Sequence, residues 1–342
     1  MKIRSPLKTI SQILFLKAPI EAQLIITRRC NLSCGYCTEY DSVSPPVPLD
    51  ALKERIDKLH ELKVTNLSLL GGEPLMHPDL ASIISYGNRL SQVSVTTNGF
   101  LITEDLIKKL NHVGLSNMEV SIDQIEKDKT GFIQKNYRTL QPKLELLKKF
   151  ATFDVHLNLV LCEQTKHQFR ETIDEFKKFG FFVSIDILHN EKGGVEIGGG
   201  EYLDLWEYYY QSGVSFSYLE YEYGKAILSG QKPKWKCRAG SRSLYIDEYG
   251  NVQYCSAQRG KLNQPLTHYT RADILREHHQ YKGCESGCSL LCVYRDSMLD
   301  NFPIKTLKGA IKTISVGAAL RAKPTASKTL STPSLEKVSI SP

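Results

Sequence analysis

Residues 27–37 read Thr27-Arg-Arg-Cys30-Asn-Leu-Ser-Cys34-Gly-Tyr36-Cys37 and directly follow an apolar run at 24–26 that predicts a strand. Three closely spaced thiolates on one loop can hold three corners of an iron–sulfur cluster and leave the fourth corner open. A structural zinc site is the alternative, because clustered intracellular cysteines often bind zinc. Zinc requires four ligands in a closed site, however, and no fourth Cys or His lies close in sequence. The spacing therefore favours an iron–sulfur cluster with an open corner.

The composition is that of an ordinary soluble globular protein, and 342 residues suffice for one large domain and a smaller one. A net charge of +7 suits an anionic substrate, RNA or a membrane surface and does not choose among them. The cysteines form two distant groups with only Cys162 between them, which indicates metal ligands rather than disulfides. Gln12 and Lys17 interrupt the apolar run near the N-terminus, which argues against a signal peptide, and no apolar run is long enough to span a membrane. We therefore predict a cytoplasmic protein.

Strands and amphipathic helices alternate along the first half of the chain. Apolar residues three or four positions apart predict helices at 49–62, 79–90, 103–113, 138–150 and 166–179. Short apolar runs predict strands at 64–70, 93–96, 118–122, 155–161 and 181–188, in addition to the strand at 24–26. This alternation is typical of right-handed βαβ units and a parallel sheet. Because six units are too few for an eight-stranded barrel, we predict an α/β fold with a partial (β/α)6 TIM-like barrel over residues 20–190.

Unusual residues follow these strands. Gly71-Gly-Glu-Pro74 follows the second strand, Thr96-Thr-Asn-Gly99 follows the third, and Ser121-Ile-Asp123 closes the fourth. Each motif alone is also a common turn or core sequence. The carboxyl ends of parallel strands, however, meet on the face where such folds bind their ligands. The motifs and the cysteine loop are therefore predicted to share one site.

The residue types suit particular contacts. Gly71 and Gly72 let backbone approach a ligand, and unpaired strand-end carbonyls can accept hydrogen bonds from an ammonium group. Ser121 and Asp123 offer acceptors suited to a ribose diol. Asn158, which is polar in an otherwise apolar strand, is either a further contact at this face or a satisfied core amide.

The succession CxxxCxYC, GGEP, TTNG and SxD after four strands resembles the radical S-adenosylmethionine (radical SAM) superfamily, whose six-unit partial barrel matches residues 20–190. The resemblance implies that Cys30, Cys34 and Cys37 bind a four-iron four-sulfur (4Fe-4S) cluster whose fourth iron is chelated by S-adenosylmethionine (SAM). It also implies that further residues contact the adenine, the methionyl ammonium, the ribose and the carboxylate of the cofactor. These residues are Tyr36, Gly71, Gly72, Glu73, Asn98, Ser121, Asp123 and Asn158. Gln124 stands where the family usually has glycine, and the methionine carboxylate has four basic candidates: Lys127, Lys129, Lys135 and Arg138.

A second cysteine group lies between 237 and 292. Residues 244–247 and 251–254 predict the arms of a β-hairpin, with Cys237 and Cys255 near its base. Cys284, Cys288 and Cys292 follow at spacings of four, and any two of them complete a set of four thiols. Four cysteines also suit a closed zinc site. The pattern C-x12-G-x4-C resembles the SPASM extension of radical SAM enzymes, or its shorter relative twitch, which implies an auxiliary 4Fe-4S cluster and one spare thiol.

The remaining segments complete the predicted organisation. Residues 1–19 are predicted as an N-terminal extension, 191–234 as a linker with an aromatic helical segment, and 235–300 as a small hairpin-and-helix cluster domain. Residues 301–323 predict a basic amphipathic helix, which either packs on the barrel or contacts a membrane surface or RNA from 304 onward. Residues 324–342, rich in Ser, Thr and Pro, are predicted to be disordered.

The leading hypothesis is a radical SAM enzyme. By the resemblance, a reductant such as flavodoxin or ferredoxin reduces the first cluster, and SAM is cleaved to a 5'-deoxyadenosyl radical that abstracts hydrogen from a peptide or small-molecule substrate. The auxiliary cluster would bind substrate or accept the electron left by an oxidation. The short segment before the barrel has no recognisable peptide-binding region, which weakens a leader-peptide version. The alternative is a non-catalytic zinc or iron–sulfur metalloprotein whose basic tail binds nucleic acid or membrane.

Overall fold

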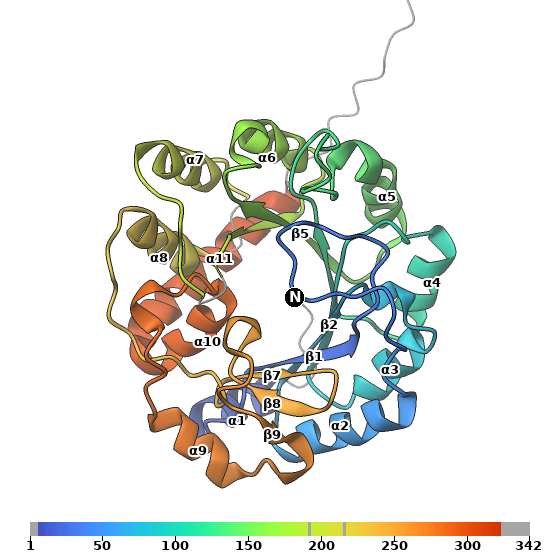
Figure 1. Cartoon of the computed structure of the whole chain (residues 1–342), viewed down its shortest axis with the longest axis vertical. Coiled ribbons are helices and arrows are strands. Elements are labelled where there is room, and N and C mark those ends of the chain that lie inside the picture. Colours follow the sequence, from blue (N-terminus) through green and yellow to red (C-terminus); the bar gives the residue numbers. More distant parts are fainter. Residues whose placement is uncertain (1–5, 191–192, 215–216, 323–342) are drawn as a thin grey trace, which may run out of the picture.

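The computed structural model describes residues 6–190, 193–214 and 217–322. Its centre is a curved parallel sheet in which each of six strands pairs with the next along the chain: β1 (Glu21–Thr27), β2 (Asn66–Gly71), β3 (Gln92–Thr97), β4 (Asn117–Ser121), β5 (Asp154–Leu161) and β6 (Phe182–Ile187). The connecting helices lie outside the sheet (Figure 1): α2 (Leu49–Glu61), α3 (Leu80–Gly87), α4 (Glu104–His112), α5 (Tyr137–Phe150) and α6 (Phe169–Lys177). The predicted α/β partial barrel is confirmed.

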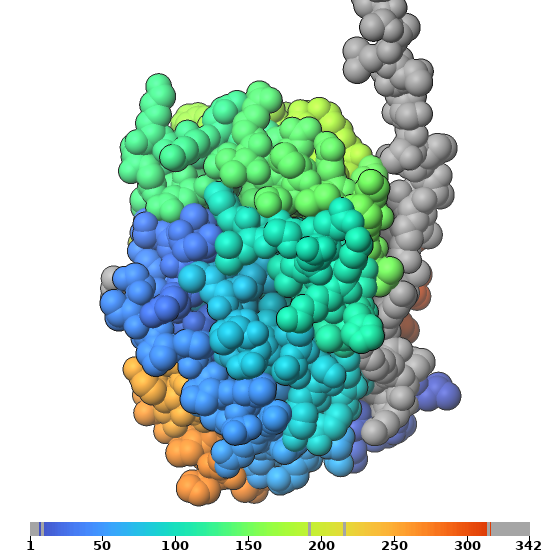
Figure 2. All heavy atoms as spheres, turned by 90° about the vertical axis from the view of Figure 1, so that its right-hand side faces the viewer, coloured from blue at the N-terminus to red at the C-terminus, as the bar shows by residue number. Residues whose placement is uncertain are grey.

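Local sequence signals account for several helix ends. The Thr103 side chain accepts a hydrogen bond from the Leu106 N–H at the start of α4, and Asn136 caps α5 in the same way through the Thr139 N–H. The predicted helix at 166–179 is divided into a short 3-10 turn at Lys166–Gln168 and α6. From the side, helices α2 to α5 cover the barrel wall in chain order, from blue to green (Figure 2).

The predicted hairpin is present and extends the barrel sheet. Strand β7 (Ser243–Ile246) pairs in parallel with β1, so that Glu21 lies opposite Ser243. Strands β8 (Asn251–Gln253) and β9 (Gln264–Pro265) continue the sheet in antiparallel fashion. The second cysteine region is therefore built onto the edge of the barrel next to β1.

Helices from the second half of the chain cover the side of the barrel between β6 and β1 (Figure 1). After α7 (Gly200–Gln211) come α8 (Tyr218–Leu228), α9 (Arg271–His279) and α10 (Leu291–Asn301). Arg295 of α10 donates hydrogen bonds to Glu21 of β1 and to Glu220 of α8. Arg295 thus joins α10, which carries it, to β1 and to α8 through ion pairs.

The described chain begins with helix α1 (Pro6–Phe15) and ends with helix α11 (Pro303–Ala322). Part of α11 packs on α8, since Lys312 Nζ lies 3.9 Å from the centre of the Tyr218 ring. Among the described residues no helix combines the length and the apolar character needed to cross a membrane. The tail predicted at 324–342 lies outside the described residues.

Candidate active site

The three-cysteine loop leaves the carboxyl end of β1 and is tied to neighbouring loops by its backbone. The Cys30 N–H bonds to the Asp41 carbonyl at 3.1 Å, and the Gly35 N–H bonds to the Phe132 carbonyl at 2.9 Å. A side chain at Gly35 would place its Cβ 2.3 Å from the Phe132 ring, so any larger residue there would force that ring to move. Cys30, Cys34 and Cys37 are all free thiols. The loop thus presents three thiols on a fixed backbone.

Burial is the main influence on these sulfur atoms. It raises the pKa of Cys30 and Cys34, and the negative charge of an ionised Cys37 raises both further, as that of Cys34 does for Cys30. Lys135 acts in the opposite direction on the pKa of Cys34. A cation that binds all three sulfurs would remove this mutual repulsion, since metal ligands are thiolates. The donor set therefore fits an iron–sulfur cluster.

The two glycines after β2 are required by the cysteine loop itself. The Gly72 N–H bonds to the Thr27 carbonyl at 2.9 Å. A Cβ at Gly72 would lie 2.4 Å from the carbonyl oxygens of Arg28 and Arg29, and one at Gly71 would lie 2.0 Å from that of Thr27. We predicted these glycines as ligand contacts; in addition, they allow the GGEP segment to pack directly on the loop backbone.

Glu73 links three of the strand-end segments. Its carboxylate is fully buried and accepts hydrogen bonds from the Leu75 N–H, the Thr97 hydroxyl and the Asn98 N–H at 2.7–2.9 Å. The Glu73 N–H bonds in turn to the Arg29 carbonyl. Burial raises the pKa of Glu73, although these hydrogen bonds oppose the shift. Glu73 thus fixes the GGEP and TTNG segments against the cysteine loop.

Asn98 reaches the cysteines directly. Its Nδ2 lies 2.8 Å from Asn31 Oδ1 and 3.7 Å from Cys30 Sγ. The predicted TTNG motif is therefore in contact with the first cysteine.

A second group of polar side chains forms around Asp123. The Tyr36 hydroxyl donates to Asp123 Oδ2 at 2.6 Å, and Lys135 Nζ lies 3.3 Å from the same oxygen. Lys135 also lies 5.2 Å from the centre of the Tyr36 ring. Burial alone lowers the pKa of Lys135, but Asp123 and the nearby thiols raise it overall. Tyr36 and Asp123, which were predicted to contact different parts of a cofactor, are hydrogen-bonded to each other.

Lys135 is distinguished from the other basic candidates by this position. Arg138 pairs instead with the exposed Glu126 carboxylate at 2.8 Å, away from the cysteine loop. Among the described residues, Lys127 and Lys129 contact neither Asp123 nor the thiols, whereas Lys135 influences both. Sequence spacing does not distinguish the four, because Lys127, Lys129 and Lys135 lie in a loop without periodicity and Arg138 lies in the first turn of α5.

Ser121 and Asn158 occupy neighbouring positions on β4 and β5, where they are paired in register. The Asn158 side chain donates to Ser184 Oγ at 3.0 Å and to Asp186 Oδ2 at 2.9 Å. The Asn158 side chain therefore points into the barrel interior, where both of its amide N–H groups are hydrogen-bonded to residues of β6.

Four of the five downstream cysteines lie together. Cys237 is influenced electrostatically by Cys288, Cys255 and Cys284, and burial raises its pKa strongly. Cys292 differs, because it receives a contact from Gln23 Nε2 at 3.7 Å and is influenced by Glu21 and Asp186 inside the barrel. Within the described residues, no group of three or more His, Cys, Asp or Glu side chains is arranged to hold one metal ion.

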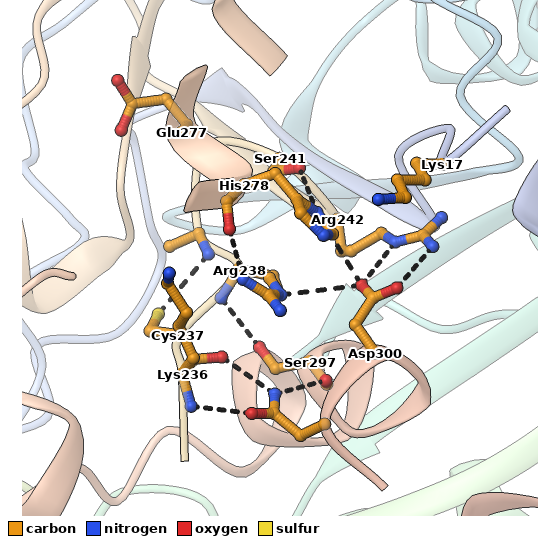
Figure 3. A network of polar contacts seen from close by, with 12 residues as sticks. Lys17, Lys236, Cys237, Arg238, Ser241, Arg242, Glu277, His278, Ser297 and Asp300 are labelled. Atoms are coloured by element: carbon orange, nitrogen blue, oxygen red, sulfur yellow. Dashed lines mark hydrogen bonds and ion pairs between the residues drawn. The ribbon is translucent and has the colours of Figure 1, made fainter. Parts of the chain in front are cut away.

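A buried ionic network supports the segment that carries Cys237 (Figure 3). Arg242 donates two hydrogen bonds of 2.7 Å to the Asp300 carboxylate, and Arg238 lies 3.7 Å from it. The Arg238 N–H also bonds to the Ser297 hydroxyl at 2.9 Å. The network joins the start of the hairpin to α10, and neither arginine was singled out by sequence analysis, since single basic residues in a loop carry no pattern.

Replacement of Asp300 with alanine is expected to lower the free energy of unfolding by about 3–5 kcal/mol, because it leaves a buried guanidinium unpaired. The Arg242 side chain is 2% exposed and that of Asp300 is 12% exposed. Urea unfolding followed by circular dichroism measures the change. Asp204→Ala is the control, since the Asp204–Arg170 pair is exposed and its loss is expected to cost less than about 1 kcal/mol. Equal losses in both variants would contradict the prediction.

Comparison with known proteins decides the family. The model of the radical SAM superfamily matches residues 24–176, which contain the cysteine loop and the later strand-end motifs. Residues 24–176 form a radical SAM domain. The matched region ends within α6 and so includes most of the barrel.

Individual relatives are more distant. The radical SAM chain is 36% identical over 115 residues to a probable GTP 3',8-cyclase of Archaeoglobus fulgidus, which covers 32% of this chain and 38% of that protein. It is 27% identical over 161 residues to the PqqA peptide cyclase of Bradyrhizobium diazoefficiens, which covers 45% and 42%. These alignments thus span less than half of the curated relatives.

A solved structure resembles more of the chain. The crystal structure of Streptococcus suis SuiB bound to its precursor peptide SuiA matches 84% of this radical SAM chain and 74% of SuiB, with a TM-score of 0.59 and 16% identity. At this identity the likeness concerns the fold. Because it covers 84% of the chain, the likeness extends beyond the barrel.

Proposed function

We propose that this radical SAM protein is an enzyme that reductively cleaves SAM and abstracts a hydrogen atom from an organic substrate. The observation that carries the proposal is the direct bonding of the strand-end motifs to the cysteine loop, through Glu73, Asn98 and the Asp123 group. Cys30, Cys34 and Cys37 would hold a 4Fe-4S cluster. When bound, the cluster and SAM supply a carbon radical after one-electron reduction, and the protein binds and orients the reactants.

The residues around the loop have separate tasks in this proposal. Lys135, which is cationic and buried beside Asp123, would meet the SAM carboxylate. The backbone of the GGEP segment and the Ser121 hydroxyl would meet the ammonium and ribose groups. Glu73 acts as a positioning residue, because its carboxylate is already bonded to three protein donors.

We further propose an auxiliary iron–sulfur cluster held by Cys237, Cys255, Cys284 and Cys288. Their mutual electrostatic influence and burial support this set. Cys292 would then be the spare thiol, since its neighbours are in the barrel interior. Four cysteine ligands leave no open position, which suits a cluster that accepts an electron.

The substrate is proposed to be a peptide or a small molecule. The name of the PqqA peptide cyclase and the peptide in the SuiB structure support the first, and the name of the GTP 3',8-cyclase supports the second. The electron would come from a carrier such as flavodoxin or ferredoxin. A precursor peptide encoded beside this gene would favour a peptide substrate.

Anaerobic purification and metal analysis test the proposal. Two 4Fe-4S clusters require about eight iron atoms per chain, and dithionite with SAM is expected to yield 5'-deoxyadenosine. Zinc in place of iron, with no cleavage of SAM, would instead support a non-catalytic metalloprotein.

Iron content should also identify the auxiliary ligands. Cys237→Ala is expected to lose about four of the eight iron atoms, because a 4Fe-4S cluster is held by four thiolates. Cys292→Ala is the matched control on the same segment and is expected to retain all of them. If Cys292→Ala also lost about four iron atoms, the proposed ligand set would be wrong.

A further inference from the structure

The barrel interior contains a cavity of about 820 Å³, which runs from the strand starts at Glu21 and Asn66 toward the strand ends. Inward-facing residues of all six strands line it, and α8 and α10 complete its wall with Glu220, Cys292, Arg295 and Asp296. Its upper lining includes Thr96, directly before the TTNG residues Thr97 and Asn98, and Asn158, which pairs with Ser121. The cavity thus leads toward the proposed radical site, and its volume suits a small molecule or a long side chain.

Carboxylates outnumber cations on the cavity wall. The acidic side chains are Glu21, Glu119, Asp154, Asp186, Glu220 and Asp296, and the basic ones are Arg295, Lys148 and His156. Lys148 donates to the Lys178 carbonyl, and His156 contacts Glu119 at 2.5 Å. Arg295 contacts Glu220 at 3.0 Å and Glu21 at 3.4 Å. The wall therefore carries an excess of acidic groups.

Asp296 has an oxygen that the protein does not satisfy. Its Oδ2 is buried and has no hydrogen-bond partner, while Oδ1 lies 3.8 Å from Arg295 Nε. The residue is only 4% exposed and lines the cavity. A buried carboxylate oxygen without a donor is costly, and a ligand that donates to it would remove that cost. Burial, together with the neighbouring carboxylates of Asp186 and Glu119, raises the pKa of Glu220 to about 7, although Arg295 opposes the shift.

We infer that the barrel cavity binds an organic cation, an ammonium or guanidinium group of the substrate, with Asp296 Oδ2 as its acceptor. The inference rests on the proposed function and specifies the substrate class of that site. The cation is either a lysine or arginine side chain of a peptide or the amino group of a small molecule. Its charge offsets the excess of carboxylates, and its N–H groups satisfy the free oxygen.

Calorimetric binding to the reconstituted, SAM-loaded protein without reductant tests this inference. Acetyl-lysine-methylamide represents a peptide and n-butylammonium a small amine; acetyl-norleucine-methylamide and 1-pentanol are their neutral counterparts. At least one of the two cations is expected to bind about tenfold or more tightly than its neutral counterpart. The cation that binds more tightly shows whether the substrate is a peptide or a small amine. Equal binding of cations and neutral analogues, or equally strong competition by sodium, would overturn the inference.

Variants locate the site. Asp296→Asn is expected to reduce cation binding about tenfold, whereas Glu126→Gln, an exposed carboxylate paired with Arg138, should leave it unchanged. Equal cation binding by Asp296→Asn and the unaltered protein would overturn the assignment. If Asp296→Asn fails to fold, the ratio of cation to neutral binding in the unaltered protein decides. Failure of SAM cleavage in the separate dithionite assay would count against the proposed function and not against cation binding.

An independent observation concerns the outside of the molecule. Most of the large apolar side chains that are exposed among the described residues lie on α1 and α11 or beside them: Leu7, Ile10, Leu14, Phe15, Leu16, Phe302, Ile304, Leu307 and Ile311. The spacings of three and four place members of each set on one helix face. Both helices lie at the right-hand edge in Figure 2, dark blue and dark red. The two helices thus face the same side of the molecule, and their exposed apolar side chains are together called the α1–α11 surface here.

The charges of these helices have one sign. Residues 6–20 and 303–322 contain six basic residues and no acidic one: Lys8, Lys17, Lys305, Lys308, Lys312 and Arg321. Lys305 and Lys308 are exposed beside the apolar side chains of α11. Exposed apolar residues with basic residues around them are typical of helices that lie on anionic lipid.

We propose that the α1–α11 surface rests on an anionic membrane surface. In sedimentation with vesicles, the protein is expected to bind phosphatidylcholine containing one quarter phosphatidylglycerol at least tenfold better than phosphatidylcholine alone. Leu307→Asp should reduce this binding, whereas Leu275→Asp, on an exposed site of α9, should not. Equal binding to both kinds of vesicle would overturn the proposal. It would also be overturned if the protein formed a concentration-dependent dimer that Leu307→Asp dissociates, or if equimolar RNA released the protein from the vesicles.

Discussion

A Cys34→Ala variant is expected to form no 5'-deoxyadenosine above the level of a protein-free control. Cys34 is the most buried thiol of the loop, at 7% exposed, and lies between two ligands that cannot hold a 4Fe-4S cluster alone. Removal of its sulfur leaves two thiolates and a second open iron corner. Dithionite assays with SAM, together with iron analysis, measure the effect. About four of the eight iron atoms should be lost as well.

Cys162→Ala is the matched control for Cys34→Ala. Cys162 is also buried, at 1% exposed, but its N–H bonds to Thr165 at the end of β5, remote from both cysteine groups in sequence. Iron content and SAM cleavage should match those of the unaltered protein. Normal cleavage by Cys34→Ala would exclude the three-cysteine loop as the site of SAM cleavage.

The barrel and its motif-bearing face follow from local sequence. Apolar periodicity predicts each βα unit, and short connections leave neighbouring strands little choice of partner. The pairing of β7 with β1 is different, because those strands are more than two hundred residues apart and no periodic signal records their register. The hairpin could thus be predicted, but its position on the barrel edge could not.

The sequence predicted where the site residues lie more completely than it predicted what their side chains bind. Glu73 was placed at the correct strand end, but a motif cannot show that three protein donors already occupy its carboxylate. The spacing of Cys284, Cys288 and Cys292 leaves the spare thiol open, whereas helix α10 turns Cys292 toward Gln23 and the cavity. One signal for the cavity was available: Glu119 and Asp186 are acidic residues within buried parallel strands, where apolar side chains are the rule.

These contacts connect the two cysteine groups through the barrel. The β7–β1 pairing fixes the hairpin beside the strand that carries the first cysteine loop, while α10 carries Cys292, Arg295 and Asp296 into the interior. The second cysteine region therefore contributes to the wall of the proposed substrate cavity.

A Gly72→Ala variant is expected to lose the first cluster and with it most SAM cleavage, although the barrel should still form. The added Cβ would lie 2.4 Å from the carbonyl oxygens of Arg28 and Arg29, so the cysteine loop must move away from the GGEP segment. We expect about four iron atoms to remain, held by the downstream thiols. Gly200→Ala is the control, because nothing lies within 4 Å of its added Cβ. Full iron content and cleavage in Gly72→Ala would show that the loop tolerates displacement, and the proposed packing requirement would be wrong.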